Sequence, residues 1–451
     1  MDRIDRIEAI PVAYPDPNDF NTTRRTVLVK VTTADGVTGW GECIAMWPEA
    51  CRAVKLVIEE GLLPVVRGMD PTDTASVWQA MRRHVWWYGE GGIASLAISG
   101  VDIALWDIAG KIAGKPVHDL LGGLKQERLR ANASSHVNKK GEAACVAEVV
   151  GFFEAGFPSC KLGFAKKGES DIGGDPDTDV SFIRALRAAL GDSAEILVDI
   201  GNGVRWDVET AIDVANRMSD YRIGWYEEPL YPTDDPGYRK LKASTQVRIA
   251  SGEREFTEAG YRRQMEFVQA VDVYGVDPAR VEGITGFASV DALCRAHGKV
   301  INAHAWSTAI TTAASLHLSL ASANAEIFEF KPFPVVVQDE LVTEKIWHRD
   351  GWAYPLTGPG LGIEVRERRI TRDELYTADE AFVTGTAAEI LPLRELDGRH
   401  IGARAGAPPT DQPIEVGSLT ARLQRLYRQV ARGELDGKLT AFSGWLTPAG
   451  E

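Results

Sequence analysis

The chain has 451 residues, 44% of them hydrophobic, and is long enough to form two or three domains with sizeable cores. Its 50 basic and 64 acidic side chains give a net charge of −14. This balance argues against a general nucleic-acid binder and against a protein that binds anionic membrane surfaces.

The cysteines indicate a reducing compartment. There are five, and none forms a CxxC pair, so we expect free thiols at Cys43, Cys51, Cys145, Cys160 and Cys294. The N-terminal residues MDRIDRIEAIPV lack an apolar signal core, and no apolar run approaches membrane-spanning length. We therefore expect a cytoplasmic protein that binds neither membranes nor nucleic acids.

The first elements along the chain are strands followed by helices. The segment 25–43 alternates around Asp35 and Gly36, which predicts a β-hairpin. The apolar stretch 91–114 has the residue spacing of a long helix. This order is typical of an α+β domain, which we place at residues 1–126.

From about residue 127, short apolar runs each end in a polar residue and are followed by a helical stretch. The polar residues are 38, 28, 26, 24, 27 and 25 residues apart, close to the length of one strand-plus-helix unit. A polar residue after a strand is often only a helix N-cap, but seven in register make that explanation improbable for the set. Eight such units form an α/β fold, the (β/α)8 TIM-like barrel, in which catalytic groups lie at the carboxyl ends of the strands. We predict this barrel at 127–332, with ionisable side chains at seven strand ends: Lys161, Asp199, Glu227, Glu253, Asp277, His304 and Glu329.

Glu227 and Glu228 are adjacent in the run YRIGWYEEPLYP, so a strand would point them to opposite faces. One of them faces solvent or a helix, and we expect Glu227 to point into the barrel mouth with Asp199 and Glu253. Three carboxylates this close repel one another unless a divalent cation lies among them. Ligands that are all oxygen favour Mg²⁺, which keeps open positions for water or substrate.

Several motifs of the chain are specific in combination. They are ALWDIAGKIAGKPVHDLLGG, VDIGN, WYEEP, ASGE, VDPARVEGIT, and NAHAWS followed by FEF. Together they resemble the mandelate racemase-like subgroup of the enolase superfamily, over about residues 1–368. The resemblance implies a modified barrel of the enolase type, with a capping domain completed by a return segment at 333–368. It also implies a Mg²⁺ ion bound by Asp199, Glu227 and Glu253, and abstraction of the α-proton of a carboxylate substrate through an enediolate.

The resemblance also assigns acid–base residues. His304 after the seventh strand and Asp277 after the sixth match a histidine base and the aspartate that orients it and raises its basicity. Glu329 matches a carboxylic acid that can donate to the substrate carboxylate. The other histidines have no comparable setting: His84, His118, His136, His297, His317, His348 and His400.

The second barrel strand departs from the subgroup's Lys-x-Lys pattern. In CKLGFAKK, Lys161 matches the first lysine and can lie near the substrate carboxylate, but Gly163 stands in place of the second. Lys166 and Lys167 lie farther along, and we interpret them as a solvated pair. A racemase needs a donor and an acceptor on opposite faces, whereas a β-elimination can run with His304 alone taking the α-proton.

We therefore predict a Mg²⁺-dependent hydro-lyase that dehydrates an acid sugar, either an aldonate or an aldarate, and forms a homo-oligomer. The alternatives are a racemase or epimerase of a 2-hydroxy acid such as mandelate, and a catalytically weakened barrel. Segments 13–26 and 44–51 are expected to be capping loops that set specificity. Arg24 and Arg25 fit better as surface charges at the base of the hairpin than as ligands of the substrate.

The last segment, 369–451, resembles the end of a branched-chain aminotransferase of the pyridoxal-phosphate type. The similarity lies in ELYTADEAF, GTAAEI and DGR. In that family the loop that matches 385–388 contacts the substrate carboxylate or the cofactor phosphate. Because the half that carries the Schiff-base lysine is absent, we expect neither bound pyridoxal nor aminotransferase activity, and interpret the segment as a remnant.

Overall fold

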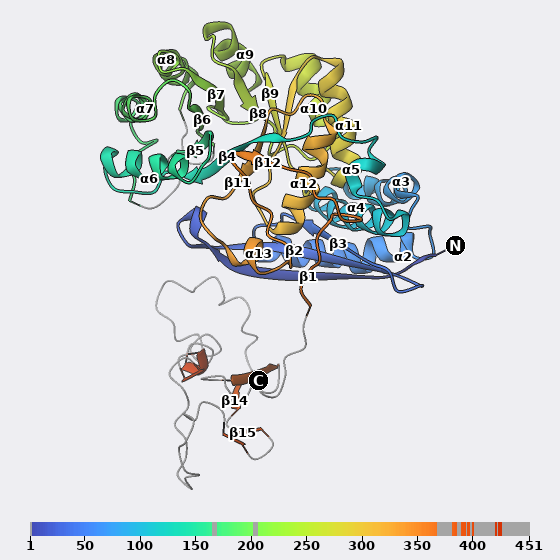
Figure 1. Cartoon of the computed structure of the whole chain (residues 1–451). Coiled ribbons are helices and arrows are strands. Elements are labelled where there is room, and N and C mark those ends of the chain that lie inside the picture. The colour runs from blue at the N-terminus through green and yellow to red at the C-terminus, as the bar shows by residue number, and fades with distance from the viewer. Residues whose placement is uncertain are drawn as a thin grey trace, which may run out of the picture. The chain divides into compact units, whose positions relative to one another are not determined.

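The computed structural model describes residues 2–164, 169–201 and 206–367, and short segments between 381 and 425. The chain divides into two compact units, Met1–Arg366 and Glu367–Glu451. The first unit combines a small antiparallel sheet and its helices with a barrel of parallel strands (Figure 1).

The small sheet consists of three antiparallel strands in chain order: β1 (Ile4–Asp16), β2 (Thr22–Thr33) and β3 (Thr38–Cys43). Pairing of β2 with β3 confirms the hairpin predicted from the alternating segment, and Gly36 in its turn has a φ of +86°. Segment 13–26, expected to be a loop, instead contains the end of β1 and the start of β2, joined by a 3-10 helix at Pro17–Asp19. The expectation fails because both ends of this segment pair with each other as strands.

Helices pack against this sheet, and the longest is α4 (Gly92–Ala113). Glycines allow it to lie directly on β3, because a side chain at Gly41 would collide with the backbone oxygen of Gly100. The expectation that no apolar run reaches membrane-spanning length is wrong for α4, whose 22 residues are long and apolar enough to cross a membrane by length and composition alone. However, 83% of its apolar window is buried inside the protein, as in a core helix. The other helices are α1 (Pro48–Leu56), a π-helix (Val57–Leu62), α2 (Leu63–Val66), α3 (Thr74–Val85), a 3-10 helix (Trp86–Tyr88) and α5 (Val117–Leu120).

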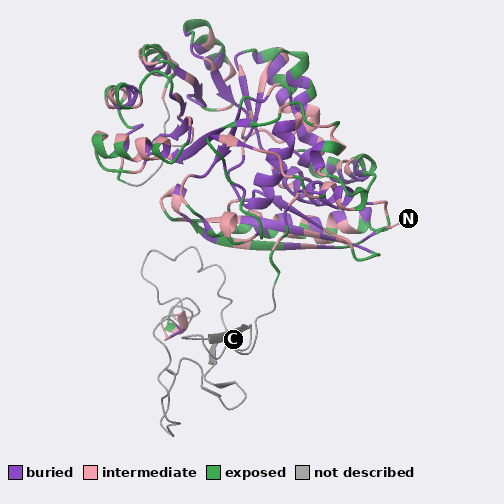
Figure 2. Ribbon diagram, viewed as in Figure 1, coloured by how far each residue is buried: buried purple, intermediate pink, exposed green. Residues whose placement is uncertain are grey.

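The barrel has eight parallel strands, which confirms the predicted fold class. They are β4 (Leu129–His136), β5 (Ser159–Gly163), β6 (Glu195–Asp199), β7 (Ile223–Glu227), β8 (Ile249–Ser251), β9 (Val273–Val276), β10 (Val300–Ala303) and β11 (Ile327–Phe330). Helical segments follow the first seven strands: α6 (Glu142–Glu154), α7 (Pro176–Leu190), α8 (Val208–Ser219), α9 (Asp235–Ser244), α10 (Glu258–Arg263) with a π-helix (Gln264–Val268), α11 (Gly283–Ala296) and α12 (Ala309–Ala321). Figure 2 shows that the barrel strands are largely buried and that helices such as α6 to α9 carry exposed residues, whereas α12 is buried along almost its whole length.

The barrel closes between β10 and β11, the two ends of its hydrogen-bonded strand order. At this seam, the side-chain oxygen of Asn302 accepts hydrogen bonds from the backbone N–H groups of Glu326 (2.9 Å) and Ile327 (3.1 Å). A side chain thus supplies acceptors that a strand backbone supplies elsewhere.

After the barrel, the chain returns toward the N-terminal domain through α13 (Val336–Asp339) and β12 (Trp352–Ala353), which pairs antiparallel with β4. The backbone of Gly360 then exchanges hydrogen bonds of 2.9 Å with Lys115 and Val117. Residues 333–366 therefore contact both the barrel and the segment that follows α4.

The second unit contains two short antiparallel pairs of strands. They are β13 (Ala381–Gly385) with β14 (Glu389–Leu393), and β15 (Glu395–Leu396) with β16 (Arg399–His400). Residues 386–388, and most of the aminotransferase-like segment 369–451, lie outside the described residues. The interpretation of that segment as a remnant without cofactor stays a prediction.

Candidate active site at the barrel mouth

Strand alternation explains why the predicted residues point into the barrel. Leu197 of β6 and Trp225 of β7 belong to a buried cluster with residues of β8, β9 and β11. Side chains two residues apart on a strand share a face. Asp199 and Glu227 each lie two residues beyond these core positions, at the last residue of the strand, and so point inward at its carboxyl end.

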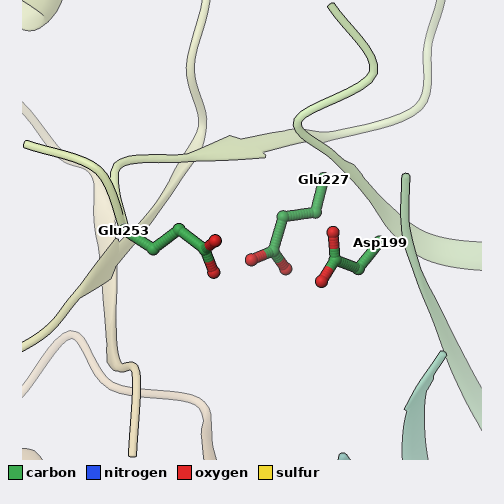
Figure 3. Close-up of side chains that lie close together, drawn as sticks. All are labelled: Asp199, Glu227 and Glu253. Carbon is green, nitrogen blue, oxygen red and sulfur yellow. The ribbon is translucent and has the colours of Figure 1, made fainter. Parts of the chain in front are cut away.

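The three predicted metal ligands converge. One oxygen each of Asp199, Glu227 and Glu253 lie within 4.8 Å of one another, and Figure 3 shows the carboxylates directed toward a common point. The donor set is all oxygen, which fits a hard divalent cation such as Mg²⁺. Burial raises the pKa of Glu227 to about 8; Lys161 opposes this shift, and the neighbouring carboxylates add to it. This crowding of like charges is what a bound cation would relieve.

Glu227 and Lys161 are fixed by short polar contacts. Lys161 Nζ lies 3.2 Å from Oε1 of Glu227 and 2.7 Å from Oε1 of Glu329. The indole N–H of Trp225 donates to Oε2 of Glu227 at 3.0 Å. Burial disfavours the charged form of Lys161, but the surrounding carboxylates outweigh it and hold its pKa well above the usual range. A charged lysine therefore lies beside the carboxylate cluster, where a substrate carboxylate could reach it.

His304 and Asp277 form the predicted pair just beyond β10 and β9. Nδ1 of His304 lies 2.8 Å from Oδ2 of Asp277, whose other oxygen accepts from the N–H of Ala279 at 2.8 Å. Nε2 of His304 lies 3.5 Å from Oε2 of Glu253. Burial lowers the pKa of His304, but Glu253 and Asp277 outweigh it and raise the value to about 9. The contact with Asp277 fixes the ring and leaves Nε2 facing the carboxylate of Glu253.

Arg254 is a residue that sequence analysis missed. Its Nε lies 2.6 Å from Oε2 of Glu228, and one terminal nitrogen lies 3.3 Å from Oε1 of Glu253. The side chain of Glu228 is buried, so it does not face solvent, and its partner is this arginine. The backbone of Glu228 has a φ of 42°. Arg254 thereby links Glu228 to the candidate ligand Glu253. Its place directly after Glu253 was the available signal.

A cavity of about 430 Å³ opens at this mouth. Lys161, Asp199, Glu253 and His304 line it from the barrel. The N-terminal domain contributes Asp19, Arg24, Ile44, Met46 and Trp47. Both segments expected to set specificity therefore reach the cavity wall.

Two interpretations made from the sequence are corrected at this cavity. Arg24 is not a surface charge, because only 13% of its side chain is exposed, and its guanidinium lies 4.2 Å from the ring centre of Trp306. His136, which had no evident setting in the sequence, lines the cavity beside Gly163. Lys166 and Lys167 lie outside the described residues.

Comparisons with known families cover both parts of the first unit. Residues 17–122 match the family described as mandelate racemase / muconate lactonizing enzyme, N-terminal domain. Residues 144–369 match the family described as enolase C-terminal domain-like.

Individual relatives match over most of their lengths. The chain is 30% identical over 353 residues to a D-galactonate dehydratase of Pectobacterium atrosepticum. This match covers 77% of this chain and 90% of the relative. It is 29% identical over 361 residues to a D-galactarolactone cycloisomerase of Agrobacterium fabrum, with 77% and 91% covered. Among solved structures, an enolase-superfamily member from Polaromonas sp. JS666 superposes with a TM-score of 0.73 at 32% identity, covering 81% of this chain and 96% of that one.

Proposed function

The chain belongs to the mandelate racemase / muconate lactonizing enzyme family of the enolase superfamily, and from this premise we propose that it is a hydro-lyase that dehydrates an acid sugar. The observation that carries the proposal is the meeting of three carboxylates and a histidine–aspartate pair at one barrel mouth. D-galactonate dehydratases at 30% identity support the reaction class.

We infer that Asp199, Glu227 and Glu253 hold the metal, because their oxygens converge and are all hard donors. Enzymes of this family depend on a divalent metal, and Mg²⁺ is the ion that this donor set favours. When bound, the ion stabilises the negative charge that develops on the carboxylate oxygens of the substrate.

The chain's own side chains hold the substrate and move the proton. Lys161 is buried and charged, so it can bind the substrate carboxylate, and Glu329, which lies 2.7 Å from its Nζ, is placed beside the same group. Nε2 of His304 takes the α-proton, because Nδ1 is occupied by Asp277. An α-proton beside a carboxylate is weakly acidic, so the base must be held within reach of it, and the contact with Asp277 holds the ring that bears Nε2.

Gly163 argues against the racemase alternative. That alternative needs a second base in place of the missing lysine, on the face of the substrate opposite His304. We propose elimination that starts from the His304 face only. We also propose that the protein forms a homo-oligomer. We place it in the cytoplasm, because its five cysteines are buried and free, as is usual in a reducing compartment.

The test is a screen of the purified full-length protein with Mg²⁺ against a library of aldonates and aldarates, beginning with D-galactonate. A 2-keto acid product that disappears with chelator and returns with added Mg²⁺ is the expected result. Absence of any dehydration, with epimers of a 2-hydroxy acid interconverted instead, would assign the racemase alternative. No transamination of branched-chain amino acids should be detected in the same preparation.

A further inference from the structure

Gly163 and His136 lie side by side, in register across the ends of β5 and β4. A Cβ atom at position 163 would overlap Nδ1 of His136 and lie 2.9 Å from its Cε1. The backbone of Gly163 is not left-handed, so space rather than conformation requires glycine here. The imidazole of His136 occupies the room that a longer side chain at 163 would need.

Three neighbours fix the ring of His136. Phe20 stacks on it with ring centres 5.6 Å apart, and Trp306 meets it nearly edge-on at 4.8 Å. Oδ1 of Asp19 lies 3.7 Å from Nε2 of the ring. Asp19 is itself held, since its other oxygen accepts from Nε of Arg24 at 3.0 Å. His136 thus has a carboxylate partner and a defined orientation, as His304 has, although its carboxylate contact is longer.

The pair of His136 and Asp19 is placed to contact a hydroxyl group. Both line the active-site cavity, and 14% of each side chain is exposed. Nε2 and Oδ1 are 3.7 Å apart, and a hydroxyl group placed beside them can accept from Nε2 and donate to Oδ1. Because Nδ1 lies against Gly163, Nε2 is the nitrogen that can pass a proton to a bound molecule.

We propose, on the basis of the dehydration proposed above, that His136 is a second catalytic acid that protonates the departing hydroxyl group. His304 takes the proton from C2, the C2–H electron pair forms the C2=C3 bond, and the C3–O bond breaks. Nε2 of His136 gives its proton to that oxygen, which leaves as water. The enol gains a proton on C3 and loses one from its oxygen to give the 2-keto acid. Solvent then carries the proton from His304 back to His136.

In this assignment, His304 removes the proton from C2 and His136 delivers a proton to the leaving oxygen. His304 lies beside Glu253 among the carboxylates, where the α-carbon of a bound carboxylate is expected. His136 lies over β5 at the cap side of the cavity, beside Asp19 from the N-terminal domain. The second pair is complete only where the β1–β2 turn meets the barrel.

The experiment compares two leaving groups in the full-length, Mg²⁺-loaded protein. Its probes are an aldonate that the wild type dehydrates and the 3-deoxy-3-fluoro analogue, because fluoride leaves without needing a proton. We expect His136→Asn to lower kcat for dehydration by about 10²-fold or more, as for a positioned acid–base group, while fluoride release stays near the wild-type rate. His304→Asn should abolish both reactions. His84→Asn, on an exposed face of α3, should change neither.

Exchange of the α-proton with deuterated water provides a check on folding, because it needs His304 but not His136. We expect His136→Asn to retain it. Loss of water and fluoride release together, or a rise in KM alone, would show that His136 only binds substrate, and the inference would be wrong. Dehydration by His136→Asn at the wild-type rate would also overturn it and leave the proposed function standing. A wild type that dehydrates none of the acids would remove the proposed function, and this inference with it.

Discussion

Glu227 is the residue at which the metal proposal can be tested with the smallest change of shape. Both of its oxygens accept from nitrogen donors, Lys161 on one side and Trp225 on the other. Glu227→Gln removes one charge from the cluster and turns one acceptor into a donor. We expect Mg²⁺ affinity, measured by titration calorimetry, to fall by at least about 10-fold, since even outer partners of a metal site cost that much.

Activity of Glu227→Gln should fall in parallel with its affinity for the ion. Glu209→Gln, which alters an exposed ion pair with Lys240, is the matched control and should change neither quantity. Wild-type Mg²⁺ affinity in the Glu227 variant would mean that the three carboxylates do not form the metal site.

Substitutions of His304 and Asp277 should reduce activity to different extents. We expect His304→Asn to reduce α-deuterium exchange and turnover by about 10²-fold or more, because the base itself is removed. Asp277→Asn keeps the base and disturbs only its tautomer and basicity, so its loss should be smaller, about 10-fold to 100-fold. Exchange is followed by NMR in deuterated water. Equal exchange rates in wild type and His304→Asn would refute the assignment.

At the residue scale, the sequence was informative where local pattern decides position. Asp199 and Glu227 could be placed because strand alternation and strand ends are local properties. His136 and Arg24 could not, because their surroundings come from distant segments: Trp306 packs on both, and it follows β10. The residues near His136 in the sequence do not indicate its contact with Trp306.

Helices α5 and α12 meet through a buried pair of histidines. Nδ1 of His118 and Nδ1 of His317 are 2.8 Å apart, so one ring donates and the other accepts. Burial lowers the pKa of His317 to about 4, from 6.5 in an exposed histidine. Its neutral form is therefore part of the folded state.

The pH dependence of stability follows from that shift. An unfolded His317 takes up a proton near pH 6.5 and the folded one only near pH 4, so the contribution of His317 to the free energy of unfolding is full above pH 6.5 and falls as pH drops toward 4. The loss is about 3 kcal/mol for a shift of this size. Urea unfolding between pH 4 and 7 measures it. His317→Gln should flatten this slope and the exposed-site control His297→Gln should not; an unchanged slope in His317→Gln would contradict the prediction.

At the scale of elements, the barrel was predictable because its unit recurs at nearly constant length. The N-terminal segment 13–26 was not, because its proline, aspartate and asparagine residues are typical of loops. In the fold, β1 extends to Asp16 and pairs residue by residue with the start of β2. Pairing with a neighbouring strand overrides local propensity there.

Within the first unit, the N-terminal domain and the barrel are joined by buried polar contacts. Lys331, just after β11, lies 2.7 Å from Asp16 at the end of β1, and both side chains are almost fully buried. Glu42 of β3 accepts hydrogen bonds from Thr308 and Thr311 at the start of α12. These contacts fix the cap against the mouth and so complete the cavity.

Truncation after Arg366 tests the division of the whole molecule into two units. All the candidate site residues, and the backbone contact of Arg366 with Leu341, lie in the first unit. We therefore expect the shortened chain to keep its Mg²⁺ affinity, kcat and melting temperature. Full-length protein purified in parallel is the control, and it should show no pyridoxal absorbance. Loss of activity in a truncated chain that still melts cooperatively would make the C-terminal segment a working part of the site.

The overlap between Gly163 and His136 also constrains the order in which this site can have changed. A lysine cannot enter at 163 while the imidazole remains, because even its first carbon has no room. Either the ring shifts or position 136 becomes smaller before a longer side chain can enter at 163, so the two positions cannot be exchanged independently.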